Sequence, residues 1–346
     1  MSTEEILDHV VNRHDLTEEQ MTYIMHKIMS GQASPAQIGG FLVALKMKGE
    51  TVDELVGAAR VMRELSTPVS INSDNVVDTC GTGGDGANLF NVSTAAAFVV
   101  AACGGKVAKH GNRSVSSTTG SADVLEAAGI CLSITAEQVA KCVEEVGVGF
   151  MFAPAHHSAM KHAIGPRKEL AMRTLFNLLG PITNPASIVR QVIGVFDVKW
   201  CRTLAEVLKK LGSQHVLVVH SEDGLDELTL AGKTFVTELC RGEIVEYEIT
   251  PEDVGLTIQS VKELAVSSAQ ESLNMINCAL GGSNDPVASK AADLIALNAG
   301  AAVYVSGIAD SLKEGVDMAA DAIGSGLAKA KMQDLAAFTQ CCQQIQ

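Results

Sequence analysis

The chain has 346 residues, which exceeds the usual size of one domain, so we expect two lobes. Its formal net charge of -14 disfavours binding to nucleic acid or to an acidic membrane surface, because both are polyanions. Hydrophobic residues make up 47% of the chain and aromatic residues 4%, and the 31 glycines indicate many tight turns, as in an α/β protein. Basic residues gather around Lys106 to Arg113, so a small anionic ligand fits this chain better than a polymer.

Cysteine spacing and apolar runs bear on the cellular compartment. The nine cysteines are odd in number, contain no C-x-x-C pair and lie mostly in apolar stretches, which is typical of free thiols in a reducing cytoplasm. The N-terminal Met-Ser-Thr-Glu-Glu lacks the pattern of a signal peptide, and no later stretch has about 18 uncharged apolar residues in a row. We therefore expect a cytoplasmic protein without a membrane anchor.

Three capping patterns predict a small helical lobe in the first seventy residues. The predicted helices are one over 21–29 capped by Thr17 and Gln20, one opened by Ser34-Pro35 and ended by Gly49, and one over 52–64 capped by Thr51 and Glu54.

From Asn75 onward, short β-branched runs alternate with helical patterns. The predicted strands lie at 76–77, 106–108, 132–134, 192–196 and 216–219. This alternation predicts an α/β fold with a mostly parallel central sheet covered by helices on both faces. Residues 1–70 would form a small N-terminal α-helical lobe, and residues 71–346 a large α/β lobe that binds ligands beyond the carboxyl ends of its strands.

Two segments depart from this alternation. Residues 155–180 are strongly helical, so we expect the chain to return there to the helical lobe, with helices from about 160–182. Residues 228–249 have the pattern of a β-meander with a turn at Arg241-Gly242-Glu243. Such a meander would add antiparallel strands at an edge of the sheet.

The densest chemical signal is the run from Val77 to Gly86, VDTCGTGGDG, which leads from a predicted strand into a glycine loop. Asn91-Val92-Ser93-Thr94 follows and opens an apolar helix. Glycines let backbone N–H groups approach phosphate oxygens, while a helix start adds unpaired donors and partial positive charge. The run is neither a Walker motif nor the G-x-G-x-x-G dinucleotide motif, and a glycine turn alone is weak evidence. Its neighbours strengthen the hypothesis of a phosphate site.

A second polar segment, Lys109 to Ser117, directly follows the predicted strand at 106–108 and is continued by Gly120-Ser121. It contains two cations, an imidazole, an amide and three hydroxyls just past a strand end. A polyphosphate would meet hydrogen-bond donors of every kind there. A solvated polar loop is the alternative interpretation.

In this order and spacing, DTCGTGGD, NVST and KHGNRSVSS closely resemble the anthranilate phosphoribosyltransferase family of tryptophan biosynthesis. The likeness continues through GPR at 165–167, RTLFNLLGP at 173–181 and GLDE at 224–227. It implies transfer of the phosphoribosyl group from phosphoribosyl pyrophosphate (PRPP) to the amino nitrogen of anthranilate, with release of pyrophosphate. It also implies that the reaction uses Mg²⁺ as a cofactor and that two Mg²⁺ ions bind. It also implies a nucleoside phosphorylase/phosphoribosyltransferase-like fold, with the substrates meeting between the lobes, and a homodimer formed through the helical lobes.

The resemblance further implies which residues contact the substrates. Those facing PRPP would be Gly81, Gly84, Asp85, Asn91, Val92, Ser93, Thr94, Lys109, His110, Gly111, Asn112, Arg113, Ser114, Val115, Ser116, Ser117 and Ser121. Those facing anthranilate would be Gly81, His110, Asn112, His157, Arg167 and Pro181. Leu89 and Met160 depart from the family pattern, which bears on one phosphate contact and on the shape of the anthranilate channel.

Two carboxylates are the candidate metal ligands. Displacing pyrophosphate from a ribose carbon proceeds most easily through an oxocarbenium-like state, so the charge on the leaving group must be neutralised. Asp226 and Glu227 follow the predicted strand from His215 and offer hard oxygen ligands for Mg²⁺. Ser93 adds a hydroxyl ligand, and Asp223 is a candidate ligand through water. A solvated acidic turn is the alternative for these carboxylates.

On the acceptor side no strong general base is needed, because the aromatic amine of anthranilate is already neutral. Arg167 offers a planar fork that suits a carboxylate, and Gly165-Pro166 is predicted to start the helix that presents it. Asn112 is suited to orient the amine or the carboxylate.

Four histidines fall near these motifs. His110 and His157 are candidates for lining the site, because one lies in the phosphate segment and the other lies ten residues before Arg167. His156 and His162 are expected to be surface or structural residues, because they lack the acid residue and spacing of a metalloprotease helix.

Two other functions stay open at this point. A pyrimidine nucleoside phosphorylase would share the implied fold, but it should carry a different lysine-serine loop and no counterpart of Arg167. A catalytically silent relative that binds nucleic acid would need a broad basic surface, which a chain of net charge -14 does not offer. Thymidine phosphorolysis tests the first function, and retention on heparin tests the second.

Overall fold

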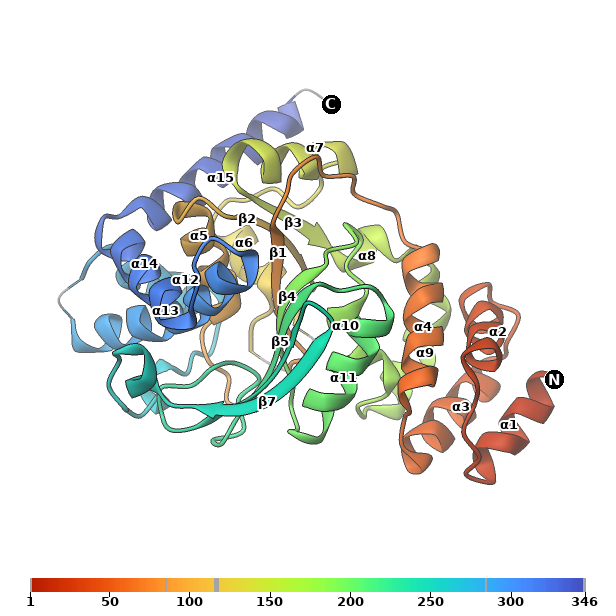
Figure 1. Ribbon diagram of the computed structural model, residues 1–346. Coiled ribbons are helices and arrows are strands. Elements are labelled where there is room, and N and C mark those ends of the chain that lie inside the picture. Colours follow the sequence, from red (N-terminus) through yellow and green to blue (C-terminus); the bar gives the residue numbers. More distant parts are fainter. Residues whose placement is uncertain (1, 85, 115–117, 284, 345–346) are drawn as a thin grey trace.

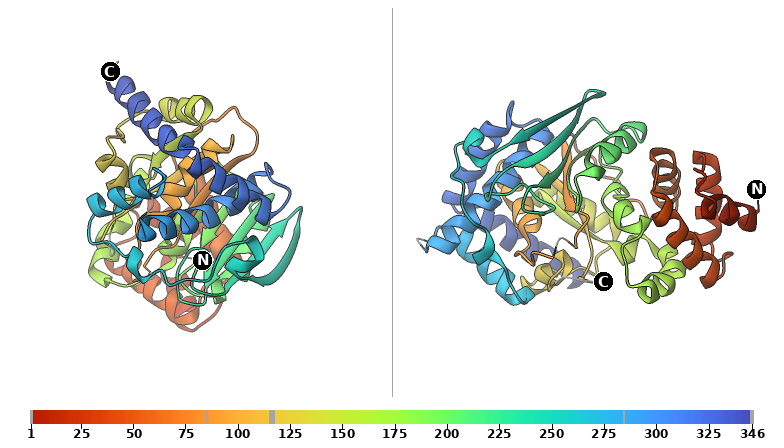
Figure 2. Two further views of the ribbon diagram at one scale, coloured as in Figure 1. Left: turned by 90° about the vertical axis from the view of Figure 1, so that its left-hand side faces the viewer. Right: turned by 90° about the horizontal axis from the view of Figure 1, so that it is seen from below.

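The computed structural model describes residues 2–84, 86–114, 118–283 and 285–344, and two lobes lie side by side in it (Figures 1 and 2). The helical lobe begins with α1 (Thr3–Val11), α2 (Glu18–Met29), α3 (Pro35–Lys48) and α4 (Val52–Glu64). Each of these helices starts with a capping box that satisfies its first backbone N–H groups. The three helices predicted from their capping residues are therefore confirmed.

The α/β lobe contains a seven-stranded sheet, counted over the described residues, in the order β3-β2-β1-β4-β5-β6-β7. Its strands are β1 (Val76–Gly81), β2 (Lys106–Gly111), β3 (Val148–Phe152), β4 (Arg190–Gly194), β5 (His215–Ser221), β6 (Thr234–Cys240) and β7 (Glu243–Ile249). The pairs from β3 to β5 are parallel, whereas β5-β6 and β6-β7 are antiparallel. The predicted sheet, mostly parallel with antiparallel strands at one edge, is confirmed.

Helices cover both faces of this sheet (Figure 1). The helices that follow β1 along the chain are α5 (Val92–Ala102), α6 (Ser121–Ala127), α7 (Ala136–Lys141), α8 (Ala153–His156), α9 (Lys161–Leu170), α10 (Leu175–Ile182), α11 (Lys199–Lys210), α12 (Ala269–Ala279), α13 (Pro286–Ser306), α14 (Leu312–Gly324) and α15 (Leu327–Gln344). None of the helices in the described ranges is both long and apolar enough to cross a membrane.

Alternate strand residues point into two different hydrophobic cores. Val192 and Leu217 belong to the core that includes α5 and α13. Ile193 and Val218 belong to a second core, which runs without interruption through α10 and α11 to the helical lobe. The helix α9 packs against α2 and α3. The chain therefore returns to the helical lobe after β3, and one core joins the two lobes.

Two local predictions were wrong. Residues 132–134, predicted as a strand, form a loop before α7. Leu132 and Ile134 pack against the core without a strand partner, and a short apolar run alone does not distinguish these cases. Gly165-Pro166 does not start a helix, because Pro166 lies inside α9 and Arg167 lies in its last turn. Pro166 has no backbone N–H, so it cannot donate the i to i−4 hydrogen bond at its position in α9.

Candidate active site

A crevice forms where β1 and β4 lie side by side. The chain leaves β1 toward β2 and β3, and it returns to β4 on the other side of β1. The loops that follow β1 and β4 therefore turn away from each other, which opens a crevice beyond the carboxyl ends of the strands. The glycine loop follows β1, and the turn with Asp226 and Glu227 follows β5.

Glycines are required where Asp226 meets the ends of β1 and β4. The N–H of Gly83 donates to Oδ2 of Asp226 at 2.6 Å. A Cβ atom at Gly81 would lie 2.2 Å from the same oxygen. A Cβ atom at Gly194 would lie 1.4 Å from the backbone oxygen of Asp226. Both positions must lack a side chain so that the carboxylate can approach the glycine loop.

A cavity of about 340 Å³ opens between the glycine loop, the start of α5 and the segment after β2. We call it the loop cavity. Lys109 lies at its floor with 3% of its surface exposed, and Nζ donates to the backbone oxygen of Thr79 and, at 3.1 Å, to Oγ of Ser93. Burial lowers the pKa of Lys109 from its ordinary value, and the charge of Asp78 opposes that shift. The cation is thus held in place at the floor by neutral oxygens.

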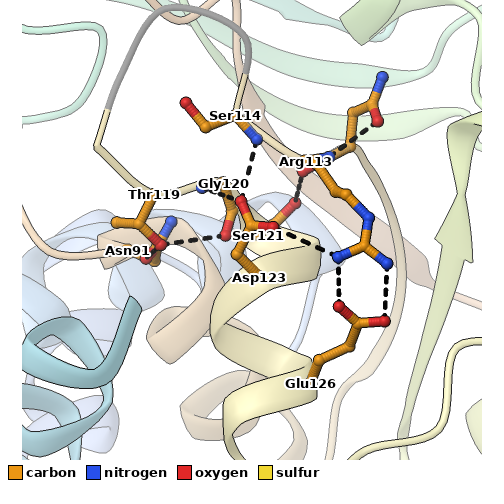
Figure 3. A network of polar contacts seen from close by, with 9 residues as sticks. Asn91, Arg113, Ser114, Thr119, Gly120, Ser121, Asp123 and Glu126 are labelled. Carbon is orange, nitrogen blue, oxygen red and sulfur yellow. Dashed lines mark hydrogen bonds and ion pairs between the residues drawn. The ribbon is translucent and has the colours of Figure 1, made fainter. Parts of the chain in front are cut away.

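The segment after β2 is held at both ends by Asp123 (Figure 3). Its Oδ2 accepts hydrogen bonds from the N–H groups of Ser114, at 3.0 Å, and Gly120, at 2.9 Å. Arg113 forms an ion pair with Glu126 and a longer one, at 3.5 Å, with Asp123. The carboxylates on α6 therefore hold this segment at the cavity and share the charge of Arg113.

A second cavity of about 360 Å³ adjoins the first and is lined largely by α8, α9 and α10. We call it the helix cavity. Arg167 lines it with the guanidinium carbon 5.2 Å from the centre of the Phe176 ring. Met62 of α4 and Ile164 of α9 add apolar surface. A flat ring with one carboxylate would meet apolar surface and one planar cation here.

Two buried histidines lie at the junction of the cavities. The ring centres of His110 and His157 are 5.0 Å apart, and Nε2 of each has no hydrogen-bond partner among the described residues. Burial lowers the pKa of His110 to about 3 and that of His157 to about 4, with each further lowered by a neighbouring histidine. Both rings are therefore neutral at physiological pH.

Comparison with known proteins identifies the family. A model of the glycosyl transferase family helical bundle domain matches residues 4–66, and a model of the α/β domain of that family matches residues 73–329. The anthranilate phosphoribosyltransferase of Cellvibrio japonicus is 66% identical over 343 residues, which cover 99% of this chain and 100% of that relative. The chain belongs to the anthranilate phosphoribosyltransferase family.

Solved structures of this family have the same fold. The anthranilate phosphoribosyltransferase of Thermus thermophilus matches with 42% identity and a TM-score of 0.90, over 96% of this chain and 99% of that one. The Saccharomyces cerevisiae enzyme in complex with PRPP and Mg matches with 26% identity and a TM-score of 0.84, over 94% of each chain.

Most predicted substrate residues lie at the two cavities. Of the residues predicted to face PRPP, the loop cavity is lined by Gly81, Gly84, Asn91, Ser93, Thr94, Lys109, His110, Gly111, Asn112, Arg113, Ser114 and Ser121. Val92 does not line it, because its side chain is fully buried in the core. Asp85, Val115, Ser116 and Ser117 lie outside the described residues. The helix cavity is lined by Gly81, His110, Asn112, His157, Arg167 and Pro181, the six residues predicted to face anthranilate.

The remaining predicted residues divide between the cavities and other surroundings. Leu89 lines the loop cavity and Met160 lines the helix cavity. Asp223 accepts a hydrogen bond from Oγ1 of Thr229 at 2.8 Å and lines neither cavity. His156 is buried with Nδ1 2.9 Å from the backbone oxygen of Thr67, which is a structural contact.

Several residues that line the cavities were not singled out from the sequence. Arg173 and Asn177 line the loop cavity, and Asn177 lines the helix cavity as well. Both lie within RTLFNLLGP, and the polar residues beside the apolar helix pattern of this stretch could have indicated that it lines a site. Met62 and Phe176 line the helix cavity, and their apolar character is equally typical of core residues. Whether such an apolar residue lines a cavity or packs in the core depends on which face of its helix is covered by other elements.

The donor set at the loop cavity fits a hard cation. Ser93, Asp226 and Glu227 all line this cavity, and all three also line a small void that shares this part of its wall. One hydroxyl and two carboxylates are oxygen ligands of the kind that Mg²⁺ prefers, and the adjoining donors are suited to the phosphates that usually complete its coordination.

Proposed function

We propose that this protein transfers the phosphoribosyl group of PRPP to the amino nitrogen of anthranilate, giving N-(5-phosphoribosyl)anthranilate and pyrophosphate. The observation that carries the proposal is that two cavities of contrasting chemistry share a wall, including Gly81, His110 and Asn112. A group transfer needs the donor and acceptor sites to meet at one point. The family of the chain supports the same reaction.

In this proposal the loop cavity binds PRPP. The glycine loop, the start of α5 and the segment after β2 direct N–H groups, hydroxyls and Lys109 toward the phosphates. The bond from the anomeric carbon to the pyrophosphate oxygen breaks, and a bond from that carbon to the anthranilate nitrogen forms. Pyrophosphate leaves with the electron pair of the broken bond, and the nitrogen, which is strongly acidic once it carries the new bond and a positive charge, releases one proton to water. The donors of the loop cavity stabilise the charge that grows on the pyrophosphate oxygens.

We propose that Ser93, Asp226 and Glu227 are the protein ligands of two Mg²⁺ ions. Bound there, Mg²⁺ would neutralise charge on the departing pyrophosphate. Asp226 also accepts the hydrogen bond from Gly83, so the same carboxylate sets the conformation of the glycine loop.

The helix cavity would bind anthranilate, with Arg167 contacting the carboxylate and Asn112 orienting the amine. A general base is not part of the mechanism. The pKa of His110, about 3, and that of His157, about 4, make both imidazoles poor proton acceptors at neutral pH. Their neutral rings instead keep the cavity free of a second positive charge.

We also propose a cytoplasmic homodimer joined through the helical lobes. The helices of this lobe expose Val11, Tyr23 and Met47, which are 64%, 40% and 68% exposed. These apolar side chains are the candidates for contact with a second copy. Light scattering should give the molar mass of a dimer for the unaltered protein and that of a monomer for the double variant Met47→Glu with Tyr23→Glu. The mass of a monomer for the unaltered protein would contradict the proposed homodimer.

Loss of anthranilate fluorescence tests the reaction. Purified protein should consume anthranilate only when PRPP and Mg²⁺ are both present. Undiminished turnover in excess chelator would contradict the metal assignment. No turnover under any condition would contradict the proposed function, and release of thymine from thymidine and phosphate would point to a phosphorylase instead.

A further inference from the structure

Three lysine or arginine side chains line the loop cavity among the described residues: Lys109, Arg113 and Arg173. Lys109 lies on the floor, bonded to Thr79 and Ser93, and Arg113 is paired with the carboxylates of α6. Arg173 has no carboxylate within ion-pair distance in the described part of the chain. Arg173 thus differs from Arg113 in lacking an acidic partner there, and from Lys109 in being only half-buried.

Arg173 is held by contacts on three sides. It lies between α9 and α10, and its backbone oxygen accepts a hydrogen bond from Nζ of Lys46, on α3, at 2.8 Å. Its guanidinium carbon lies 4.2 Å from the centre of the Phe196 ring. A Cβ atom at Gly84 would come within 2.9 Å of Nη2. The glycine loop thus lies directly against the guanidinium, and a side chain at Gly84 would require the guanidinium to move.

We propose that Arg173 binds the phosphates of PRPP, and that Lys46 positions it from the helical lobe. The inference rests on the proposed function and assigns a binding residue and a positioning residue to it. Arg173 lines the loop cavity and not the helix cavity, whereas Arg167 lines the helix cavity and not the loop cavity. A guanidinium stacked on an aromatic ring keeps its edge N–H groups free, and these match phosphate oxygens in a bidentate contact.

The first test compares Arg173→Gln with Arg173→Lys. PRPP affinity is measured by calorimetry with Mg²⁺ and without anthranilate, so that no reaction occurs. Loss of a charge-assisted contact should weaken PRPP binding roughly ten- to a hundredfold in Arg173→Gln. Arg173→Lys keeps the charge but not the fork, so it should recover only part of that loss. The anthranilate KM, measured at saturating PRPP, should change less than about threefold in both variants.

Arg202→Gln is the matched control. Arg202 lies on α11, is exposed, and pairs with Glu206 and Glu246 away from both cavities. Its substitution removes the same charge from the protein but should leave PRPP affinity unchanged. If Arg173→Gln lowered the melting temperature but left the PRPP affinity unaltered, Arg173 would be a purely structural residue and the inference would be overturned. A rise confined to the anthranilate KM would overturn it as well.

The second test isolates Lys46, which touches neither cavity. Lys46→Met removes the hydrogen bond to the backbone of Arg173, and a PRPP affinity about two- to fivefold weaker is expected, with Lys46→Arg close to the unaltered protein. In Arg173→Gln the further change Lys46→Met should have almost no effect on PRPP binding, because residues that act together are not additive. Full additivity would overturn the positioning role. Failure of the unaltered protein to bind PRPP with Mg²⁺ would instead overturn the proposed function and this inference with it.

Discussion

The loop cavity and the helix cavity have nearly equal volumes, about 340 and 360 Å³, yet they are built in opposite ways. The loop cavity is formed by backbone N–H groups and short polar side chains on loops beyond β1, β2 and β5. The helix cavity is formed by side chains on α4 and α8 to α10. Each takes one arginine from the segment that returns to the helical lobe, Arg173 for the loop cavity and Arg167 for the helix cavity, and each guanidinium lies over a phenylalanine ring. Under the proposed function, the phosphates of PRPP and the carboxylate of anthranilate would each meet a different arginine because of where these two side chains lie.

The largest expected effect lies at the carboxylates of the loop cavity. Glu227→Gln removes a candidate metal ligand while preserving shape, and kcat should fall at least about a hundredfold, because loss of one comparable electrostatic stabiliser costs ~2.7 to 4 kcal/mol. PRPP affinity should fall far less, since the glycine loop and Lys109 remain. Steady-state kinetics at saturating substrates measure this, and raising Mg²⁺ should restore part of the activity.

Two matched variants sharpen the same point. Asp226→Asn should lower kcat as strongly and also weaken PRPP binding, because the hydrogen bond from Gly83 then ends on a neutral oxygen. Glu222→Gln, an exposed position in the same turn, should change neither constant. A kcat like that of the unaltered protein in Asp226→Asn combined with Glu227→Gln would mean that these carboxylates are surface charges.

An intermediate effect is expected at the helix cavity. Arg167→Ala should remove a charge-assisted contact worth ~1.5 to 3 kcal/mol and lower kcat/KM roughly ten- to two-hundredfold, mostly through the anthranilate KM. PRPP affinity should barely change, in contrast to Arg173→Gln. If the PRPP affinity collapsed while the anthranilate KM stayed constant, the division of labour between the two arginines would be reversed.

The smallest effect concerns the pH dependence of stability at the wall between the cavities. The pKa values of His110 and His157, about 3 and about 4, lie below the ordinary value of 6.5, because burial favours their neutral forms. The unfolded chain therefore binds more protons between pH 6.5 and about 4. Their contribution to folding is complete above pH 6.5 and decreases as the pH falls, by at most ~1.4 kcal/mol per pH unit for each ring.

Urea unfolding at pH 7.5, 6.0 and 5.0 measures this dependence. His157→Gln removes one titrating ring, so its free energy of unfolding should fall less steeply toward pH 5 than that of the unaltered protein. His14→Gln, at an exposed position in the helical lobe, is the control and should keep the full slope. Equal slopes in all three proteins would mean that His157 does not become protonated on unfolding in this range.

The sequence predicted local structure correctly where the stabilising interaction is made between residues close together along the chain. Thr17 with Gln20 and Thr51 with Glu54 predicted helix starts correctly, since a capping box closes within four residues. The glycine loop and the polar segment after β2 were recognised because each is one continuous stretch. The strand predicted at 132–134 failed because pairing depends on a distant partner, and residues 148–152 take the place beside β2 instead.

The sequence by itself determined the motifs, the alternation of strands and helices, and the resemblance that named the family. Only the tertiary structure decided which side chains share a cavity, because contacts such as Gly83 with Asp226 and Lys46 with Arg173 join residues more than a hundred positions apart. Arg167 and Arg173 lie six positions apart in one polar segment, and no local pattern distinguishes their roles. Their separation into two cavities follows from the helix end at Leu170, which lets the chain turn between them.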